Sequence, residues 1–248
     1  MKRSIIFSGR NVKTILTIVT VIFLSVIQVR ATAQQVARLT RYEVKTETLG
    51  DFRKAISLYV EQSLKNPANI LSEGYHEESD TAVLWLIERW SSREAFEKAG
   101  KDRSFKAIES LSASSLKQPA RAIYVKDLEP LSRQQWRKVA RKEDKPITIM
   151  LFVDAKPGTA NLFKEVYHKA MPPFRSEPGV VNYQLSQLEE DSTQFVTYEK
   201  FRGEEAFQYH LNFPPIQPVI DYLNTSIKKQ PFQSGLHRLI EFSPLTRQ

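Results

Sequence analysis

His210 is the residue of this sequence best suited to proton-transfer chemistry. It ends the run Ala206-Phe207-Gln208-Tyr209-His210, in a segment predicted to be helical. An imidazole titrates near neutral pH, so a histidine here could take the proton of a phenol or bind a haem iron. It could equally be a helix-end histidine that donates a hydrogen bond to a nearby carbonyl group. The sequence leaves both roles open.

Glu88 and Glu199 are carboxylates within apolar strand segments, and each needs a partner if it is buried. Their chain neighbours Arg89 and Lys200 do not fill this role, because adjacent residues of a strand point to opposite faces. We therefore expect structural hydrogen bonds at both glutamates rather than acid catalysis. Six aromatic residues nearby could line a pocket for a flat aromatic ligand, or belong to the core: Trp85, Trp90, Tyr183, Phe195, Tyr198 and Phe201.

Several kinds of site are not indicated. The chain has no cysteine, which excludes disulfides, a thiolate nucleophile and a zinc–sulfur site. The remaining histidines, His76, His168 and His237, lack the spacing of a metal site. There is no glycine-rich phosphate loop and no dinucleotide fingerprint, so neither a metal nor a nicotinamide or flavin cofactor is predicted.

The net charge of +8 does not indicate a nucleic-acid partner. Five basic residues and no acidic residue lie in the first 33 positions, which leaves 8 − 5 = +3 for the remainder. The basic residues of this first segment precede an apolar run from Ile15 to Ile27, and Ala31-Thr32-Ala33 is a small-x-small cleavage site. This is the pattern of a secretory signal peptide. We predict cleavage after Ala33 and a periplasmic or secreted protein without stable membrane association, with an uncleaved anchor as the alternative.

An internal repeat determines the domain organisation. Glu88 and Glu94-Ala95-Phe96 recur as Glu199 and Glu205-Ala206-Phe207, at an offset of 199 − 88 = 111 residues. A repeat at constant offset indicates two copies of one unit. The predicted organisation is a signal peptide, a first copy, a basic linker predicted to be helical, a second copy and a short tail, over residues 1–33, 36–127, 128–145, 146–242 and 243–248.

Each copy is predicted to run strand, helix, strand, strand, helix, strand, which is the order of a ferredoxin-like unit. The segment from Ala82 to Trp90 is apolar at nearly every position, so this strand should be covered on both faces. In the second copy, a helix from about Ala160 to Ala170 should be broken by Pro172-Pro173. The predicted fold class is therefore α+β, with two tandem ferredoxin-like units.

The repeat resembles the antibiotic biosynthesis monooxygenase family. The resemblance rests on the strand-to-helix motif of both copies and is fullest in the second copy, at Glu177-Pro178-Gly179-Val180, Tyr183, Tyr198-Glu199, Ala206-Phe207 and His210. It implies a dimeric-type α/β barrel, formed either within one chain as a pseudo-dimer or by a homodimer. The family's motif histidine corresponds to His210, whereas the first copy has Ala99 there, since 210 − 111 = 99.

The resemblance also implies a range of functions. Proteins of this fold include cofactor-independent oxygenases of phenols and quinols, haem-degrading enzymes and domains without known chemistry. The expectation is an exported, cofactor-independent monooxygenase of a small phenolic or quinol substrate, with His210 as its base. The alternatives are a protein that binds a small aromatic molecule without turnover and, less favoured, a haem-binding protein.

Overall fold

The structure is a computed structural model and describes residues 34–229 and 235–244. The predicted signal peptide lies outside the described residues. In the part of the chain that is described, no helix is long and apolar enough to cross a membrane.

Both copies have the predicted order of elements, apart from extra short helices. The first copy contains β1 (Val36–Glu43), α2 (Leu49–Lys65), β2 (Asn69–Glu77), β3 (Val83–Trp90), α3 (Arg93–Ala99), α4 (Arg103–Ser115) and β4 (Arg121–Leu128). The second contains β5 (Ile147–Asp154), α6 (Ala160–Ser176), β6 (Val180–Leu188), β7 (Gln194–Phe201), α7 (Glu204–Leu211), α8 (Gln217–Thr225) and β8 (Leu236–Ser243). Short 3-10 turns precede α2 and α8, at Thr46–Thr48 and Pro214–Ile216.

The eight strands form one closed antiparallel barrel in the order β1-β3-β2-β8-β5-β7-β6-β4. Each copy supplies four consecutive strands, and its two outer strands pair with the other copy. Tyr75 of β2 faces Glu241 of β8, and Val125 of β4 faces Leu188 of β6. Closure leaves neither copy with an unpaired sheet edge. The predicted pair of ferredoxin-like units is confirmed, and the barrel closes within one chain.

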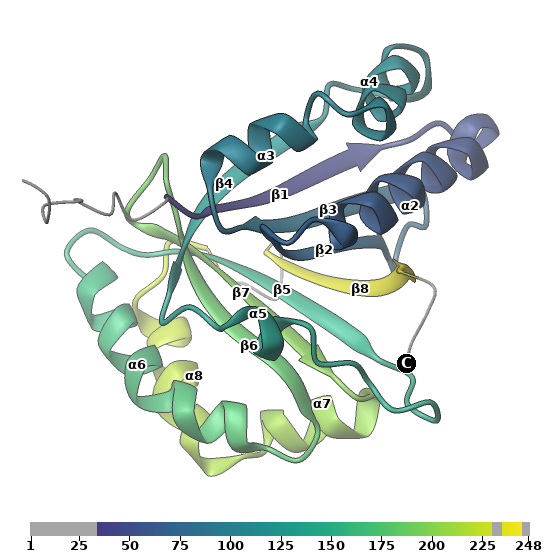
Figure 1. The fold of residues 1–248 in the computed structure, drawn as a ribbon. Helices are drawn as coiled ribbons and strands as arrows, with labels where there is room; N and C mark the ends of the chain where they lie inside the picture. Colours follow the sequence, from purple (N-terminus) through teal and green to yellow (C-terminus); the bar gives the residue numbers. More distant parts are fainter. Residues whose placement is uncertain (1–33, 230–234, 245–248) are drawn as a thin grey trace, which may run out of the picture. The chain divides into compact units, whose positions relative to one another are not determined.

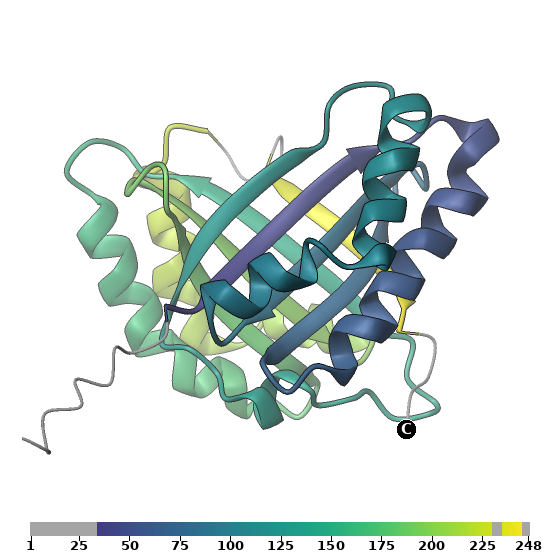
Figure 2. The same ribbon diagram turned by 45° about the horizontal axis from the view of Figure 1, so that its top comes forward.

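Side-chain alternation separates the barrel interior from two outer cores. In β3, Trp85 and Ile87 belong to the interior cluster, whereas Leu84, Leu86 and Trp90 pack beneath the helices of the first copy. Every residue of β3 is buried, which confirms that this strand is covered on both faces. Figures 1 and 2 show α2, α3 and α4 over the first copy's strands, and α6, α7 and α8 over the second's.

Two predictions about helix boundaries are wrong. Helix α6 continues through Pro172 and Pro173 to Ser176, although prolines remove backbone hydrogen bonds. Met171 and Phe174 on this stretch are fully buried against the sheet, so packing outweighs the lost bonds. The linker contains only one turn of helix, α5 (Arg133–Trp136), rather than a long helix. Its next residue, Arg137, bonds backbone carbonyls of the first copy instead of continuing the helix.

Candidate functional site

His210 lies in the core between α7 and the outer face of the second sheet. Its Nδ1 is 2.8 Å from Oε1 of Glu177, and both side chains are almost completely buried. The imidazole packs against the rings of Phe174, Tyr183 and Phe201 at centroid distances of 4.7, 5.4 and 5.2 Å. His210 lines neither of the two cavities described below. It is therefore held by an ion pair and packed rings.

A close backbone approach sets this arrangement. A Cβ atom added at Gly179 would lie 2.3 Å from the Cβ of Ala206, so only glycine lets α7 pack this closely on the start of β6. Ala206 is one turn before His210, and Glu177 precedes Gly179 by two residues. The Gly179–Ala206 contact thus brings the imidazole to the carboxylate.

Glu199 lies in the same core and has a different set of partners. Its Oε1 accepts hydrogen bonds from the Tyr183 hydroxyl at 2.8 Å and the Thr197 hydroxyl at 2.6 Å. Burial raises the pKa of Glu199, an effect that the nearby His210 partly opposes. Burial and the neighbouring carboxylate of Glu199 also raise the pKa of Tyr183. The expectation that Glu199 makes structural hydrogen bonds agrees with this geometry.

Glu88, the equivalent residue of the first copy, is bound to a cation. Arg38 Nη2 lies 2.6 Å from its Oε2, and Tyr59 and Trp90 donate to its Oε1 at 2.6 and 3.2 Å. Glu88 is fully buried on the helix side of the sheet. Its geometry too matches a structural hydrogen-bonding role.

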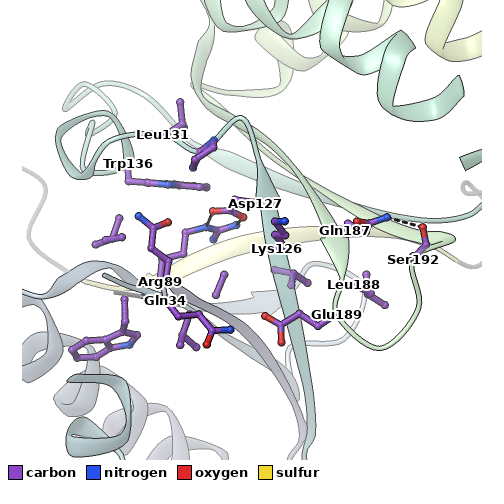
Figure 3. Close-up of a pocket in the computed structure, with 17 residues that line it drawn as sticks. Gln34, Arg89, Lys126, Asp127, Leu131, Trp136, Gln187, Leu188, Glu189 and Ser192 are labelled. Carbon is purple, nitrogen blue, oxygen red and sulfur yellow. Dashed lines mark hydrogen bonds and ion pairs between the residues drawn. The ribbon is translucent and has the colours of Figure 1, made fainter. Parts of the chain in front are cut away.

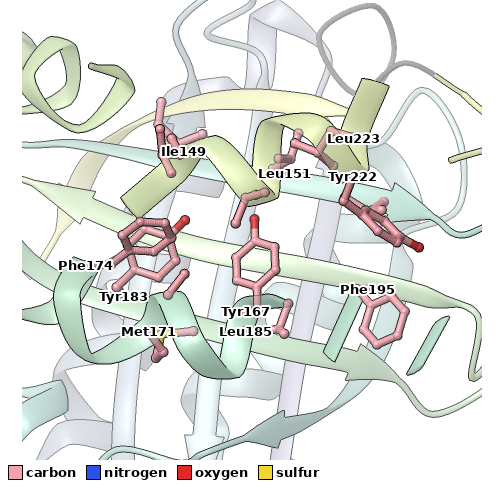
Figure 4. Close-up of a cluster of buried hydrophobic side chains, with 14 of the residues drawn as sticks. Ile149, Leu151, Tyr167, Met171, Phe174, Tyr183, Leu185, Phe195, Tyr222 and Leu223 are labelled. Carbon is pink, nitrogen blue, oxygen red and sulfur yellow. The ribbon is translucent and has the colours of Figure 1, made fainter. Parts of the chain in front are cut away.

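The six candidate aromatic residues are divided between the two faces of the barrel wall. Trp85 and Tyr198 belong to the interior cluster. Trp90 packs in the outer core of the first copy, while Tyr183, Phe195 and Phe201 pack in that of the second, part of which is drawn in Figure 4. Of the six, Trp90 alone lines the larger cavity. The structure does not bring the six together around one space.

The barrel interior carries a charged pair that the sequence analysis did not identify. Arg89 donates from Nε and Nη2 to the two carboxylate oxygens of Asp127, at 2.7 and 3.0 Å. The Ser186 hydroxyl donates to Asp127 Oδ1 at 2.6 Å. The repeat contained the signal, because Arg89 and Lys200 are 200 − 89 = 111 residues apart and both point into the barrel.

Lys200 makes the corresponding pair in the second copy. Its Nζ lies 2.8 Å from Glu73 and 2.8 Å from Glu241, and Glu241 is at the position in β8 that Asp127 has in β4. Burial alone would lower the pKa of Lys200, but the two carboxylates raise it well above its ordinary value. The hydroxyls of Tyr75 and Tyr198 bond Glu73 Oε2 at 2.5 and 2.7 Å. Both charged pairs are therefore fixed within the barrel wall.

A cavity of about 710 Å³ opens beside Arg89 and Asp127 (Figure 3). Trp136 of the linker forms part of its wall, and Figure 3 shows the indole next to the Arg89–Asp127 pair. The other lining side chains are of two kinds. Apolar ones include Ala37, Ile70, Val125, Leu131 and Leu188, and polar ones include Gln34, Lys126, Gln187, Glu189 and Ser192.

A second cavity of about 370 Å³ is lined by Glu73, Lys200 and Glu241, and also by Trp136. Trp136 is 1% exposed, lies with its ring 5.3 Å from that of Tyr198, and has the Arg89 guanidinium carbon 4.0 Å above it. The linker is held in place by Arg137, which donates to the carbonyls of Leu64, Asn69 and Ile70. Trp136 therefore borders both cavities.

The other histidines form no metal site. Among the described residues, no group of three or more His, Asp and Glu side chains could hold a metal ion. Each histidine has its own partner: His168 Nδ1 is 2.6 Å from Glu129, His237 Nδ1 is 3.1 Å from Glu77, and His76 contacts the Glu77 carbonyl.

Two sheets closed into one barrel, with helices outside and charged pairs inside, define a fused dimeric α/β barrel. The family model for antibiotic biosynthesis monooxygenase matches residues 35–110 and 146–220. The chain belongs to this family. A curated relative, an uncharacterized protein of Synechocystis sp., is 27% identical over 102 residues, which are 41% of this chain and 69% of the relative.

Solved structures share the fold over both copies. A protein of Lactobacillus acidophilus, provisionally titled a monooxygenase, aligns with a TM-score of 0.69 at 12% identity, over 84% of this chain and 93% of that one. A similarly titled protein of Fusobacterium nucleatum gives 0.68 at 15% identity, over 84% and 92%. An anthrone oxidase-like protein gives 0.58 at 11% identity, over 84% and 91%. At these identities the likeness is one of fold.

Proposed function

We propose that this protein is an exported monooxygenase that oxidises a small phenolic or quinol substrate without a metal or organic cofactor. The reaction takes place in the larger cavity. The observation that carries the proposal is the combination lining that cavity: the flat indole of Trp136 beside the buried carboxylate of Asp127 and the guanidinium of Arg89. A volume of about 710 Å³ accommodates one small aromatic molecule.

The chemistry follows from these residue types. A phenolic ring lies against Trp136, and the carboxylate of Asp127 accepts the hydroxyl proton. Arg89 stabilises the resulting anion, which itself reduces dioxygen. One oxygen atom is added to the substrate and the other leaves as water, so all four electrons come from the substrate. The apolar wall around Val125, Leu131 and Leu188 keeps bulk water from the reactive anion.

Export is the second part of the proposal. Cleavage after Ala33 makes Gln34 the first residue of the mature chain, and Gln34 lines the larger cavity. The mature protein works in the periplasm or outside the cell, where it meets small aromatic molecules rather than nucleic acid. The motif histidine, His210, serves the fold in this proposal, because its ion pair and packed rings separate it from both cavities.

Oxygen uptake tests the proposed reaction. The mature protein is incubated with a panel of naphthols, naphthalenediols and anthrones, oxygen consumption is recorded, and products formed under labelled dioxygen are analysed by mass spectrometry. Incorporation of one labelled atom per product supports the proposal. The variant Asp127→Asn should lower the rate about 10²–10⁴-fold, as expected for loss of a base. Absence of oxygen uptake across the panel would overturn it.

A second candidate is binding of a small aromatic molecule without turnover. It is favoured by the state of Asp127, whose two oxygens already accept three hydrogen bonds from Arg89 and Ser186. A carboxylate held in this way is a weaker base. Saturable binding of panel compounds without oxygen uptake identifies this function.

A further inference from the structure

We propose that the ligand of the larger cavity carries an uncharged acceptor oxygen, as in an aromatic ketone or a quinone, and that this oxygen binds Nη1 of Arg89. The inference rests on the proposed function, because it takes this cavity to be the substrate site. It adds the chemical class of the molecule and the atom that recognises it.

The first observation is an unused donor. The Arg89 side chain is only 3% exposed, and its Nε and Nη2 are bound to Asp127. Its Nη1 is buried and has no hydrogen-bond partner. A guanidinium has five N–H donors, and Nη1 carries two of them. A buried donor without a partner is costly, so an acceptor from outside the described chain is expected at Nη1.

The second observation is the rigid placement of this donor beside a flat surface. The ion pair with Asp127 fixes the plane of the guanidinium, which lies over the indole of Trp136 at 4.0 Å. Both residues line the cavity. A planar ring in this cavity can contact the indole while one ring oxygen points to Nη1, which matches a carbonyl group conjugated to an aromatic system.

The third observation is the charge of the lining. The basic side chains are Arg89 and Lys126, and the acidic ones are Asp127 and Glu189, so the formal charges cancel. A cavity with no net charge, in which the guanidinium is already neutralised, gives little advantage to an anionic ligand over a neutral one. The hydrogen bond at Nη1 then selects an uncharged acceptor oxygen.

The equivalent residue of the other copy supports the asymmetry of the site. Lys200 has the position of Arg89 after the 111-residue shift, but its ammonium group contacts two carboxylates, Glu73 and Glu241. It lines the smaller cavity, of about 370 Å³. Acceptor recognition therefore belongs to the first copy, through Arg89.

Three planar probes of one skeleton test the inference. They are 9-fluorenone with a carbonyl group, fluorene with a methylene at the same carbon, and 9-fluorenecarboxylate with an anion there. Binding to the mature protein is measured from quenching of tryptophan fluorescence and by calorimetry. We expect 9-fluorenone to bind about ten- to a hundredfold more tightly than fluorene, the range of a hydrogen bond to a charged donor. The carboxylate should bind no more tightly than the ketone.

Two variants assign the preference to Arg89. In Arg89→Met with Asp127→Asn, the guanidinium is removed without leaving a buried charge, and the preference for 9-fluorenone over fluorene should disappear while fluorene still binds. Arg121→Gln removes one exposed positive charge from the same strand and should leave the preference unchanged. Equal binding of ketone and hydrocarbon by the natural protein, binding of neither, or a preference that survives in the double variant would overturn the inference.

These outcomes are separable from the proposed reaction. The three probes are compared by binding alone, without oxygen uptake. If 9-fluorenone shows no preference while panel phenols still consume oxygen, the acceptor inference fails and the oxygenase proposal stands. If the ketone preference is present and no panel compound consumes oxygen, the protein recognises aromatic ketones without oxidising phenols.

Discussion

Glu88 and Glu199 occupy equivalent buried positions 111 residues apart, yet only Glu88 is paired with an arginine. Arg38 lies 2.6 Å from Glu88, whereas the hydrogen bonds to Glu199 come from the hydroxyls of Tyr183 and Thr197. In the second copy, Ile149 faces Glu199 across the strands, where Arg38 faces Glu88 in the first. The two copies therefore accommodate the same carboxylate by different means, and this difference can be measured.

The glutamine variants of these two residues should have opposite consequences. Glu88→Gln leaves Arg38 buried without its anion, and we expect a loss of about 3 kcal/mol, or roughly 6–12 °C in Tm. Glu199→Gln removes a carboxylate without an arginine partner, so Tm at pH 7 should be unchanged or higher. Thermal unfolding of both variants by circular dichroism measures the difference. Equal losses in the two variants would contradict the assignment.

The pH dependence of stability should reflect the Glu199 carboxyl. Burial raises its pKa above the ordinary 4.5. The folded state therefore binds this proton more tightly than the unfolded chain, and the contribution is present at low pH and lost as pH rises through the raised pKa. Glu199→Gln should flatten the dependence of unfolding free energy on pH above about 4.5, as measured by urea titration. An unchanged slope in the variant would count against this origin.

His210→Ala should reduce stability more than activity. The substitution leaves Glu177 buried without its partner and opens a space among Phe174, Tyr183 and Phe201, so we expect a loss of about 3–5 kcal/mol. The rate of oxygen uptake at a temperature where the variant is folded should remain close to that of the natural protein. His168→Ala, at a side chain that is 76% exposed, is the control. A variant with natural stability and no activity would restore His210 as the base.

Trp136→Ala should broaden the range of ligands. Trp136 borders both cavities and lies against Arg89, so its removal is expected to join spaces of about 710 and 370 Å³. Larger ring systems should then bind, with a stability loss of about 3–5 kcal/mol. Trp136→Phe keeps an aromatic wall and should retain the natural selectivity. Affinities for a series of two-, three- and four-ring phenols provide the measurement.

The mature chain should begin at Gln34. The basic segment, apolar run and Ala31-Thr32-Ala33 predict cleavage there. Intact-mass and N-terminal analysis of protein recovered from a bacterial periplasm measures the result. A chain that still begins at Met1, found either in the cytoplasm or in the membrane fraction, would contradict export with cleavage.

The sequence by itself determined the repeat, the order of strands and helices in each copy and the family. These features depend on local patterns: alternating apolar residues, turn-forming prolines and the Glu-Ala-Phe motif at a constant offset of 111 residues. The same alternation predicted that β3 is covered on both faces. It also contained the reason that Glu88 and Arg89 point apart, so their different environments followed from position alone.

Only the tertiary structure decided which residues meet. Strand closure brings Tyr75 opposite Glu241, and the linker brings Trp136 to Arg89, across separations for which the sequence has no periodic signal. Packing of Met171 and Phe174 carries α6 through two prolines that local propensity treats as a stop. Local patterns fix elements because each depends on near neighbours, whereas ion pairs and cavities depend on chain closure, which joins residues distant in sequence.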